Sequence, residues 1–217
     1  MEPDAIEIRV VGCLIEKQRT TPDVYPLSVN ALRLACNQAT NRDPVVSYDE
    51  ETVGEALRRL ALRGWTRLAS GAGSRARKYR HLLDEALDVD PAEISLLAIL
   101  MLRGPQTPGQ LKQRAERLHA FESLPAVHEA LDRLVGRGLV ARHPRRPGQK
   151  EDRYEQLLGS GAVGDVETQP AEDGGGDAPA PAPAGGSPAE DRLGRIEREV
   201  AELRSQLDTL QAELGGR

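Results

Sequence analysis

One twelve-residue pattern of apolar and polar positions occurs twice in this chain, at 53–64 and again 74 residues later at 127–138, with eight identical positions. Each copy places Val, Leu and Leu at positions i, i+4 and i+7, which line one side of a helix, and ends in Arg-Gly, which is typical of a helix C-terminus. Two short extended runs joined by a basic turn follow each copy, at 65–69 and 78–81 and at 139–143 and 152–156. This order predicts the second half of a winged helix, present twice.

Capping signals predict three helices ahead of each pair of strands. Side chains that accept hydrogen bonds at a helix N-terminus stand at Asp4, Ser28, Ser47, Asp90, Thr107 and Ser123. The fold class we expect is therefore mainly α with small β wings, as tandem winged-helix domains at 1–83 and 91–158 joined by a connector at 84–90. The stretch 94–102 is apolar nearly all round, which predicts a helix buried on more than one side, against the first domain or a partner chain.

The C-terminal part of the chain has a different composition. Residues 159–189 are mostly Gly, Ala, Pro and acid, which cannot bury enough apolar surface to order themselves, so this stretch is predicted to be a disordered linker. Residues 190–214 carry apolar side chains at alternating spacings of three and four, the pattern of a coiled-coil helix, at Leu193, Ile196, Val200, Leu203, Leu207, Leu210 and Leu214. We expect these residues to form a dimer; the alternative is a helix that docks on the chain's own folded part.

Charge is distributed unevenly along the chain. The net charge is -5, but residues 1–83 carry 13 Lys and Arg against 10 Asp and Glu, and residues 91–158 carry 11 against 8. Residues 159–217 carry 5 against 12. Both predicted domains are therefore mildly basic, which permits contact with nucleic acid without requiring it.

Several classes of site and compartment have no support in the residues. Cys13 and Cys36 lie in apolar helical stretches, as buried thiols do, and the four histidines fall at no metal-ligand spacing, so we expect no metal and no cofactor. A nucleophile elbow, a Walker loop and a dinucleotide motif are all missing, so we expect no enzyme. The longest apolar run, 96–102, is too short to cross a bilayer and no basic leader segment begins the chain, so we expect a cytoplasmic protein without a membrane partner.

Basic side chains of the wings and of the third helices are the candidate nucleic-acid contacts. Clustered cations on a turn suit phosphate groups and give affinity with little sequence choice. The candidates are Arg58, Arg59, Arg75, Arg77, Lys78, Arg80, Arg133, Arg142, Arg145, Arg146, Lys150 and Arg153. The third helices also present Glu51, Glu55, Glu129 and Asp132 outward, which makes them poor readers of base edges. The alternative is a pair of solvated basic hairpins without a ligand.

The first domain carries twelve extra residues before its third helix, within the segment 37–47. This segment offers many hydrogen-bonding groups and is a possible partner loop, formed by Asn37, Gln38, Asn41, Arg42 and Asp43. The alternative is that Asn41 and Asp43 cap and turn the chain while Arg42 pairs with a nearby acid.

An ordered string of short motifs in the first domain is similar to a known family. The motifs are Gly-Cys-Leu-Ile-Glu-Lys-Gln at 12–18, Thr-Thr-Pro-Asp at 20–23, Tyr-Pro-Leu-Ser at 25–28, Ala-Cys-Asn-Gln at 35–38 and Asn-Arg-Asp-Pro-Val at 41–45. Over about residues 5–158 the chain resembles the YceH-like family of uncharacterised bacterial proteins, domain of unknown function 480. The resemblance implies a tandem winged-helix fold, and it implies no activity or binding site.

These features lead to one principal hypothesis and two alternatives. The principal hypothesis is a non-enzymatic, transcription-regulator-like protein that self-associates through residues 190–214 and grips DNA phosphates with its wings. The first alternative is an adaptor that binds other proteins through its winged-helix surfaces without binding DNA, because the outward faces of the third helices are acidic. The second is a ligand-sensing regulator with a pocket between the two domains, beneath the 37–47 loop.

Overall fold

The structure, a computed structural model, describes residues 2–69, 76–145 and 150–159, and these residues fall in one compact unit. The predicted linker beyond Gly159, the predicted coiled coil at 190–214, and two candidate cations, Arg75 and Arg146, lie outside the described residues. The described part is mainly helical with small antiparallel sheets, as the sequence predicts.

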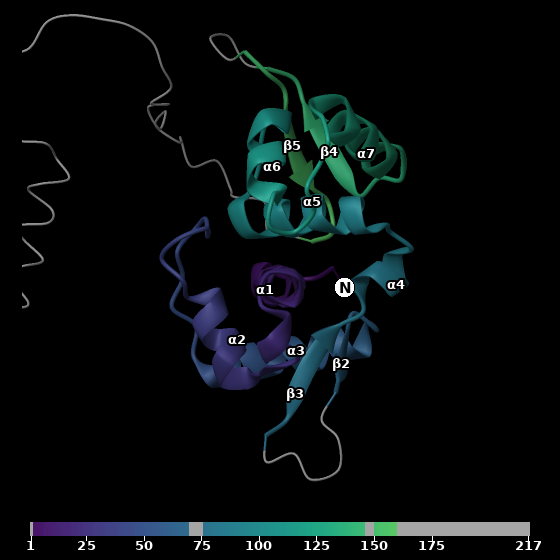
Figure 1. Cartoon of the computed structure of the whole chain (residues 1–217). Coiled ribbons are helices and arrows are strands. Elements are labelled where there is room, and N and C mark those ends of the chain that lie inside the picture. The colour runs from purple at the N-terminus through teal and green to yellow at the C-terminus, as the bar shows by residue number, and fades with distance from the viewer. Residues whose placement is uncertain (1, 70–75, 146–149, 160–217) are drawn as a thin grey trace, which may run out of the picture. The chain divides into compact units, whose positions relative to one another are not determined.

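Two lobes repeat the same order of elements, three helices followed by a β-hairpin (Figure 1). The first lobe consists of α1 (Ala5–Thr20), η1 (Pro22–Val24), β1 (Leu27–Ser28), α2 (Val29–Cys36), α3 (Glu50–Leu62), β2 (Thr66–Leu68) and β3 (Lys78–His81). After α4 (Leu83–Leu87), the second lobe consists of α5 (Pro91–Arg103), α6 (Pro108–Ala115), α7 (Leu124–Gly136), β4 (Val140–His143) and β5 (Arg153–Gln156). The predicted order of helices and strands is confirmed in both lobes.

Local capping chemistry sets most of the helix boundaries. The side-chain caps predicted from the sequence are confirmed at Asp4, Ser28, Asp90, Thr107 and Ser123. Gly64 and Gly138 follow α3 and α7 with φ angles of 77° and 69°, a left-handed conformation that glycine adopts without steric cost. Helix starts and stops thus follow from short-range sequence.

The start of α3 is different from the prediction. The prediction that this helix begins after a Ser47 cap is wrong. Asp49 is the N-cap, and its carboxylate accepts a hydrogen bond of 2.7 Å from the Thr52 amide. Asn37 accounts for the later start, because its side-chain amide donates to the Tyr48 carbonyl at 2.8 Å and accepts from the Tyr48 amide at 2.9 Å. Both backbone groups of Tyr48 are thereby used outside the helix.

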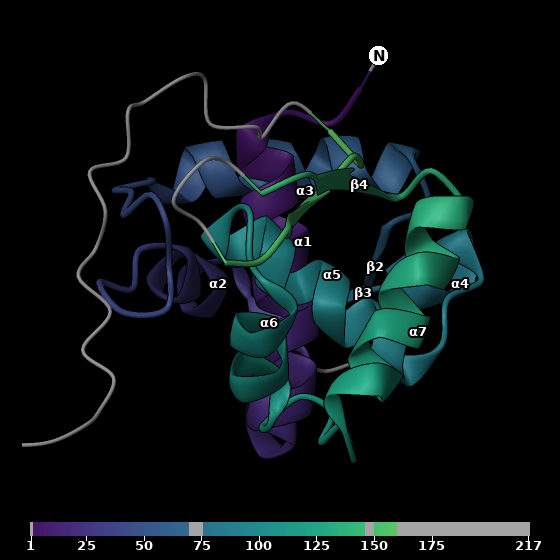
Figure 2. The same cartoon turned by 90° about the horizontal axis from the view of Figure 1, so that it is seen from above.

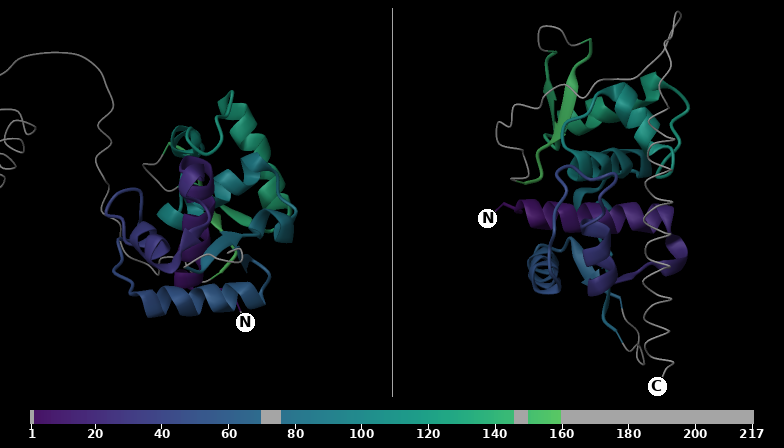
Figure 3. Two further views of the ribbon diagram at one scale, coloured as in Figure 1. Left: turned by 60° about the horizontal axis from the view of Figure 1, so that its bottom comes forward. Right: turned by 90° about the vertical axis from the view of Figure 1, so that its left-hand side faces the viewer.

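Both hairpins are antiparallel, and β1 adds a third strand beside β3 in the first lobe. The first lobe pairs Thr66 with His81, Arg67 with Arg80 and Leu68 with Tyr79. The second lobe pairs Val140 with Gln156, Ala141 with Glu155, Arg142 with Tyr154 and His143 with Arg153. Seen from two sides, the hairpins lie at opposite ends of the described part of the chain (Figures 1 and 3).

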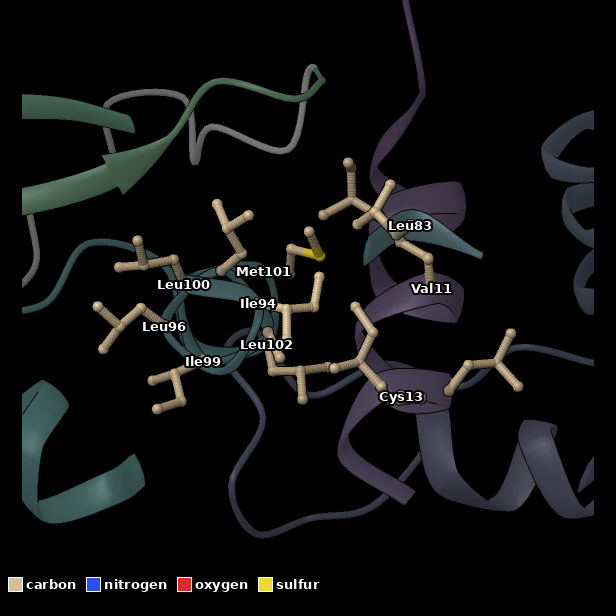
Figure 4. Close-up of a cluster of buried hydrophobic side chains, with 14 of the residues drawn as sticks. Val11, Cys13, Leu83, Ile94, Leu96, Ile99, Leu100, Met101 and Leu102 are labelled. Atoms are coloured by element: carbon tan, nitrogen blue, oxygen red, sulfur yellow. The ribbon is translucent and has the colours of Figure 1, made fainter. Parts of the chain in front are cut away.

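Helices α1 and α5 pack against each other and join the two lobes (Figure 2). Their approach is close at Gly12, where a Cβ atom would lie 3.1 Å from the Met101 Cβ and 3.1 Å from a Leu102 methyl carbon. Figure 4 shows the side chains of this interface around Val11 and Cys13. The predicted burial of 94–102 on more than one side is confirmed, with the first lobe covering part of it. Because one apolar core runs through both lobes, separate domains at 1–83 and 91–158 stay a prediction.

His81, at the end of β3, is buried between polar groups of two helices. Its Nε2 lies 2.6 Å from the Gln18 Oε1 on α1, and its Nδ1 lies 3.5 Å from an Asp84 carboxylate oxygen on α4. Burial lowers the pKa of His81 to about 4; the Asp84 carboxylate opposes this shift, and the cations Arg19 and Arg80 reinforce it. The imidazole is therefore neutral in the folded protein near neutral pH.

We expect stability to fall as the pH drops from the ordinary histidine pKa of 6.5 toward about 4, because in that window the unfolded chain binds a proton that the folded chain excludes. The loss at this site is about 2 kcal/mol between about pH 7 and pH 5, measured by urea unfolding. His81→Gln is the matched variant, because Gln156 holds the equivalent strand position in the second lobe. The variant should lose less stability over this interval, and equal losses would contradict the role of His81.

Candidate nucleic-acid interface

Two of the predicted phosphate contacts, Arg59 and Arg133, form ion pairs inside the structure. Arg59 on α3 lies 2.8 Å from Asp4 and 3.4 Å from Glu7, the two side chains of the capping box of α1. Arg133 on α7 repeats this arrangement at the capping box of α5, with both distances 2.9 Å. The glutamate of each box is almost fully buried, so each lobe uses a third-helix arginine to neutralise it.

The outward faces of the third helices carry mixed charge. Arg58 on α3 lies 3.3 Å from Glu55, one turn earlier, and both side chains are exposed. On α7 the equivalent positions are Asp132 and Glu129, which are also exposed. Carboxylates on such a face repel phosphate and leave few donors for base edges, so neither helix is suited to reading a DNA sequence.

Asp152 organises the second hairpin. Its carboxylate lies 2.6 Å from the Arg142 guanidinium and accepts a hydrogen bond of 2.9 Å from the Arg145 amide. The hydrogen bond to Asp152 raises the pKa of Arg142, and the same bond lowers the pKa of Asp152, so both groups stay charged. Arg153 is held separately, because its Nη1 donates to the Pro105 carbonyl at 3.1 Å.

A hollow of about 340 Å³ lies beside this hairpin. Its lining comes from the N-terminus of α6, from α7 and from the hairpin, at Pro108, His128, Arg142, Arg145, Lys150, Glu151, Asp152 and Tyr154. Arg145 and Lys150 are exposed, and Pro108 is the first residue of α6. Clustered cations and a helix N-terminus both attract anions, so this hollow, which we call the second-lobe hollow, is suited to phosphate.

A larger hollow of about 570 Å³ lies between α7 and the segment that joins α4 to α5. Its arginines are paired within the chain: Arg133 contacts Asp90 and Glu93, and Arg137 donates to the Asp88 carbonyl at 2.9 Å. The ligand-sensing alternative expects a pocket beneath the 37–47 loop. Neither of these two hollows is lined by residues of that loop.

The first hairpin presents its cations on the face of the sheet that points away from the core, whereas Arg142 of the second hairpin lines the hollow beside α6 and α7. Thr66 and His81 are buried, so their pair faces the core, and the next pair, Arg67 with Arg80, faces away from it. Lys78 shares this outer face, because it lies two residues before Arg80 on β3. Arg67 is not among the residues predicted from the sequence, although alternation along the run 65–69 identifies it as the outward cation.

Arg42 is the centre of the 37–47 loop. Its side chain is fully buried, and its guanidinium lies 2.5 Å from the carboxylate of Glu16 on α1. The guanidinium also donates to the carbonyls of Ala35 and Asn41 and to the side chain of Gln38, at 3.0, 2.8 and 3.0 Å. These contacts agree with the alternative in which Arg42 pairs with a nearby acid, and they keep its side chain inside the protein.

The 37–47 loop also contacts the second lobe. The Asp43 amide donates to the Leu102 carbonyl at the end of α5 at 2.8 Å, and Arg103 donates to the side chain of Asn41. Asn41 has a φ of 62°, the left-handed conformation that asparagine tolerates in turns. The predicted partner residues thus make contacts within the chain, and binding of a partner by this loop stays a prediction.

Neither a metal site nor a membrane-spanning helix is found among the residues that the structure describes. Among residues 2–69, 76–145 and 150–159, no group of three or more His, Cys, Asp and Glu side chains is arranged to hold a metal ion. No helix within these ranges combines the length and apolar character needed to span a membrane. The predicted dimerisation residues, 193–214, lie outside the part of the chain that the structure describes.

Comparison with known proteins identifies the family. A family model described as protein of unknown function DUF480 matches residues 4–149, which contain both lobes up to the second hairpin. The chain belongs to the DUF480 family. The resemblance drawn from the motifs at 12–45 is therefore confirmed.

Similar proteins occur in several bacteria. A UPF0502 protein of Geotalea daltonii is 54% identical over 155 residues, which cover 70% of this chain and 71% of its own. A UPF0502 protein of Pseudomonas fluorescens is 44% identical over 208 residues, covering 96% of this chain and 93% of its own. One of Pelobacter propionicus is 46% identical over 206 residues, covering 94% and 91%. The family and these relatives supply no function, which must be argued from the site.

Proposed function

We propose that this DUF480 protein is a non-enzymatic tandem winged-helix protein whose second lobe binds the phosphate backbone of duplex DNA. The second-lobe hollow carries the proposal, because it brings the start of α6, helix α7 and the second hairpin together around His128, Arg142, Arg145 and Lys150. In helix-turn-helix proteins the recognition helix enters the major groove and the helix before it crosses the backbone. We assign those two roles to α7 and α6 in the second lobe, because they are its consecutive second and third helices.

Charge in the second-lobe hollow supports an anionic ligand. Three cations line it against two carboxylates, and the carboxylate of Asp152 is already paired with Arg142. Arg145 and Lys150 are exposed and can approach a backbone, while the dipole of α6 adds partial positive charge at its N-terminus.

Sequence choice is expected to be weak. The exposed face of α7 includes His128, Glu129 and Asp132, and its carboxylates suit few base edges. The exposed Arg133 on the same helix is already paired with Asp90 and Glu93. Affinity then comes mainly from phosphate contacts and depends strongly on salt. A regulator of this kind binds DNA broadly rather than at one operator.

The proposal includes self-association and a cytoplasmic location. The heptad pattern at 190–214 supports a coiled-coil dimer, which would present the DNA-binding lobes in pairs. Cys13 and Cys36 are buried and unpaired, in keeping with a reducing compartment.

Replacing Arg145 and Lys150 together by alanine is expected to weaken binding of a mixed-sequence duplex and to flatten its salt dependence. Each lost phosphate contact lowers the slope of log Kobs against log salt by about 0.9, so the double variant should lose about 1.8. Fluorescence anisotropy of a labelled duplex at several salt concentrations measures both quantities.

A charge-matched control removes two cations that do not line the hollow, through Arg33→Ala with Arg117→Ala. This control should keep the wild-type slope. Absence of duplex binding by the wild-type chain at low salt, or the same slope loss in both double variants, would remove DNA binding from the second-lobe hollow.

Leu62 favours a second candidate function, an adaptor that binds other proteins. This leucine ends α3 and is 86% exposed, on the helix that also exposes Glu51 and Glu55. Acidic side chains around an exposed leucine repel phosphate and leave this face better suited to another protein than to DNA. If the duplex experiment shows no salt-dependent binding, the adaptor function replaces DNA binding as the account of these lobes.

A further inference from the structure

We propose that the outer face of the first hairpin is a second phosphate-binding surface, so that one molecule holds two duplexes at once. The inference rests on the proposed function of the second lobe and assigns the first lobe a DNA contact of its own. The contact is made by Arg67 and Arg80, with Lys78 beside them on the same face.

The pairing of Arg67 with Arg80 is unfavourable for the fold. The two residues are directly opposite on antiparallel strands, so their side chains point to the same side of the sheet. Their Cβ atoms are then about 5 Å apart, and like charges on directly opposite residues destabilise a sheet. The Glu85 carboxylate lies 3.9 Å from Arg80 but is 67% exposed, which makes it a weak compensation. Folding alone does not account for this pair, whereas an anionic ligand does.

The second lobe shows that the hairpin does not need two arginines at this register. Ala141 pairs with Glu155 at the positions equivalent to Arg67 and Arg80. In that lobe the hairpin instead places Arg142 in the hollow beside α6 and α7. The two lobes therefore carry their positive charge on opposite faces of equivalent hairpins.

A nucleic-acid backbone suits the outer face of the first hairpin better than a protein does. Ser28 of β1 pairs with Lys78, so the described side chains of this face are cationic or small and polar. The apolar side chains of the sheet, at Leu27, Leu68 and Tyr79, lie on its other face. Protein interfaces have apolar centres, whereas duplex DNA presents one negative charge about every 1.7 Å of its axis.

The fold separates the two surfaces. The lobes are joined through the close packing of α1 on α5, and the hairpins lie at opposite ends of the described part (Figures 1 and 3). A cationic surface at each end gives a single chain two separate places for a duplex, without a second copy of the protein.

A two-duplex capture experiment tests the proposal on the full-length chain with Leu203→Asp and Leu207→Asp added to every variant, because charges in the predicted seam at 190–214 prevent a dimer from presenting two second-lobe hollows. A short biotinylated duplex of mixed sequence is immobilised, the protein is bound and washed, and a fluorescent second duplex is then added. This parent chain should capture the second duplex. Arg67→Ala with Arg80→Gln should lower that capture at least about fivefold, while the affinity for a single duplex changes less than about threefold, because the second-lobe hollow is intact.

The outcomes separate this inference from the proposed function. Unchanged capture by the Arg67→Ala, Arg80→Gln variant would overturn the inference, because holding a second duplex would then not depend on this face. Binding of one duplex without capture of a second would overturn the inference alone, and no binding of any duplex would overturn the proposed function with it. Inhibition of capture by polyglutamate at far lower charge concentration than by competitor duplex would assign the face to an acidic protein and also overturn the inference.

Two controls exclude a general effect of charge or folding. The Arg33→Ala, Arg117→Ala variant should capture the second duplex as the parent chain does. Thermal unfolding of the Arg67→Ala, Arg80→Gln variant should give an unchanged or higher Tm, because a like-charge repulsion has been removed. A Tm lowered by several degrees would show that the arginine pair serves the fold, which contradicts the proposal.

Discussion

Replacing Gly12 by leucine is expected to lower the free energy of unfolding by about 3 kcal/mol. A Cβ atom added at this position would lie 3.1 Å from the Met101 Cβ and 3.1 Å from a Leu102 methyl carbon. The Met101 Cβ is fixed to the backbone of α5, so the leucine can be accommodated only if α1 and α5 move apart. Such a movement opens the apolar interface between the lobes. Urea unfolding followed by circular dichroism measures the loss.

Gly54 provides the matched control on another helix. A Cβ atom at Gly54, within α3, meets nothing within 4 Å. Gly54→Leu should therefore raise stability by up to about 1 kcal/mol, because glycine is a poor helix former. If Gly12→Leu proves no more destabilising than Gly54→Leu, the close contact between α1 and α5 is wrong.

Removing the Arg42 side chain is expected to cost about 3 to 5 kcal/mol. The guanidinium is fully buried and pairs with Glu16, and it also binds three other groups of the 37–47 loop and α2. Arg42→Ala leaves the Glu16 carboxylate, which is 14% exposed, with only the Lys17 ammonium at 3.9 Å in place of the two contacts from Arg42. Breaking a largely buried ion pair is far more costly than losing a surface pair. Urea unfolding again gives the magnitude.

Two further variants show where the loss at Arg42 comes from. Arg58→Ala removes an arginine that is 67% exposed and should change stability by less than about 0.5 kcal/mol. Adding Glu16→Gln to Arg42→Ala should restore part of the stability, since the stranded carboxylate is then neutral. Equal losses for Arg42→Ala and Arg58→Ala would disprove the buried pair.

The elements that sequence predicts well are those set by neighbouring residues. Asp90 and Thr107 cap their helices because the bonded amide is only three residues away, and Gly138 ends α7 through its own backbone freedom. The start of α3 could not be placed, because the amide of Asn37 reaches the backbone of Tyr48 across the 37–47 loop. Local pattern carries no information about such a contact.

The candidate site depends more on tertiary structure than the helices do. Arg145 and Lys150 are identified from sequence as wing cations, but His128 and the start of α6 join them only in the folded chain. Arg59 has the spacing of an outward residue on a helix, yet it contacts Asp4, which is 55 residues away in sequence. The helical period shows on which face of the helix a residue lies. It does not show which acidic side chain from elsewhere in the chain contacts that face.

The 37–47 loop has a consequence for how the two halves of the chain behave together. Only the first lobe has this segment, and it binds the end of α5 in the second lobe through one backbone and one side-chain hydrogen bond. Two similar units joined by a short connector alone would tumble semi-independently, whereas these hydrogen bonds add to the α1–α5 interface and keep the distance between the two hairpins constant. Shortening the 37–47 loop would thus loosen the orientation of the lobes before it changed the chemistry of either hairpin.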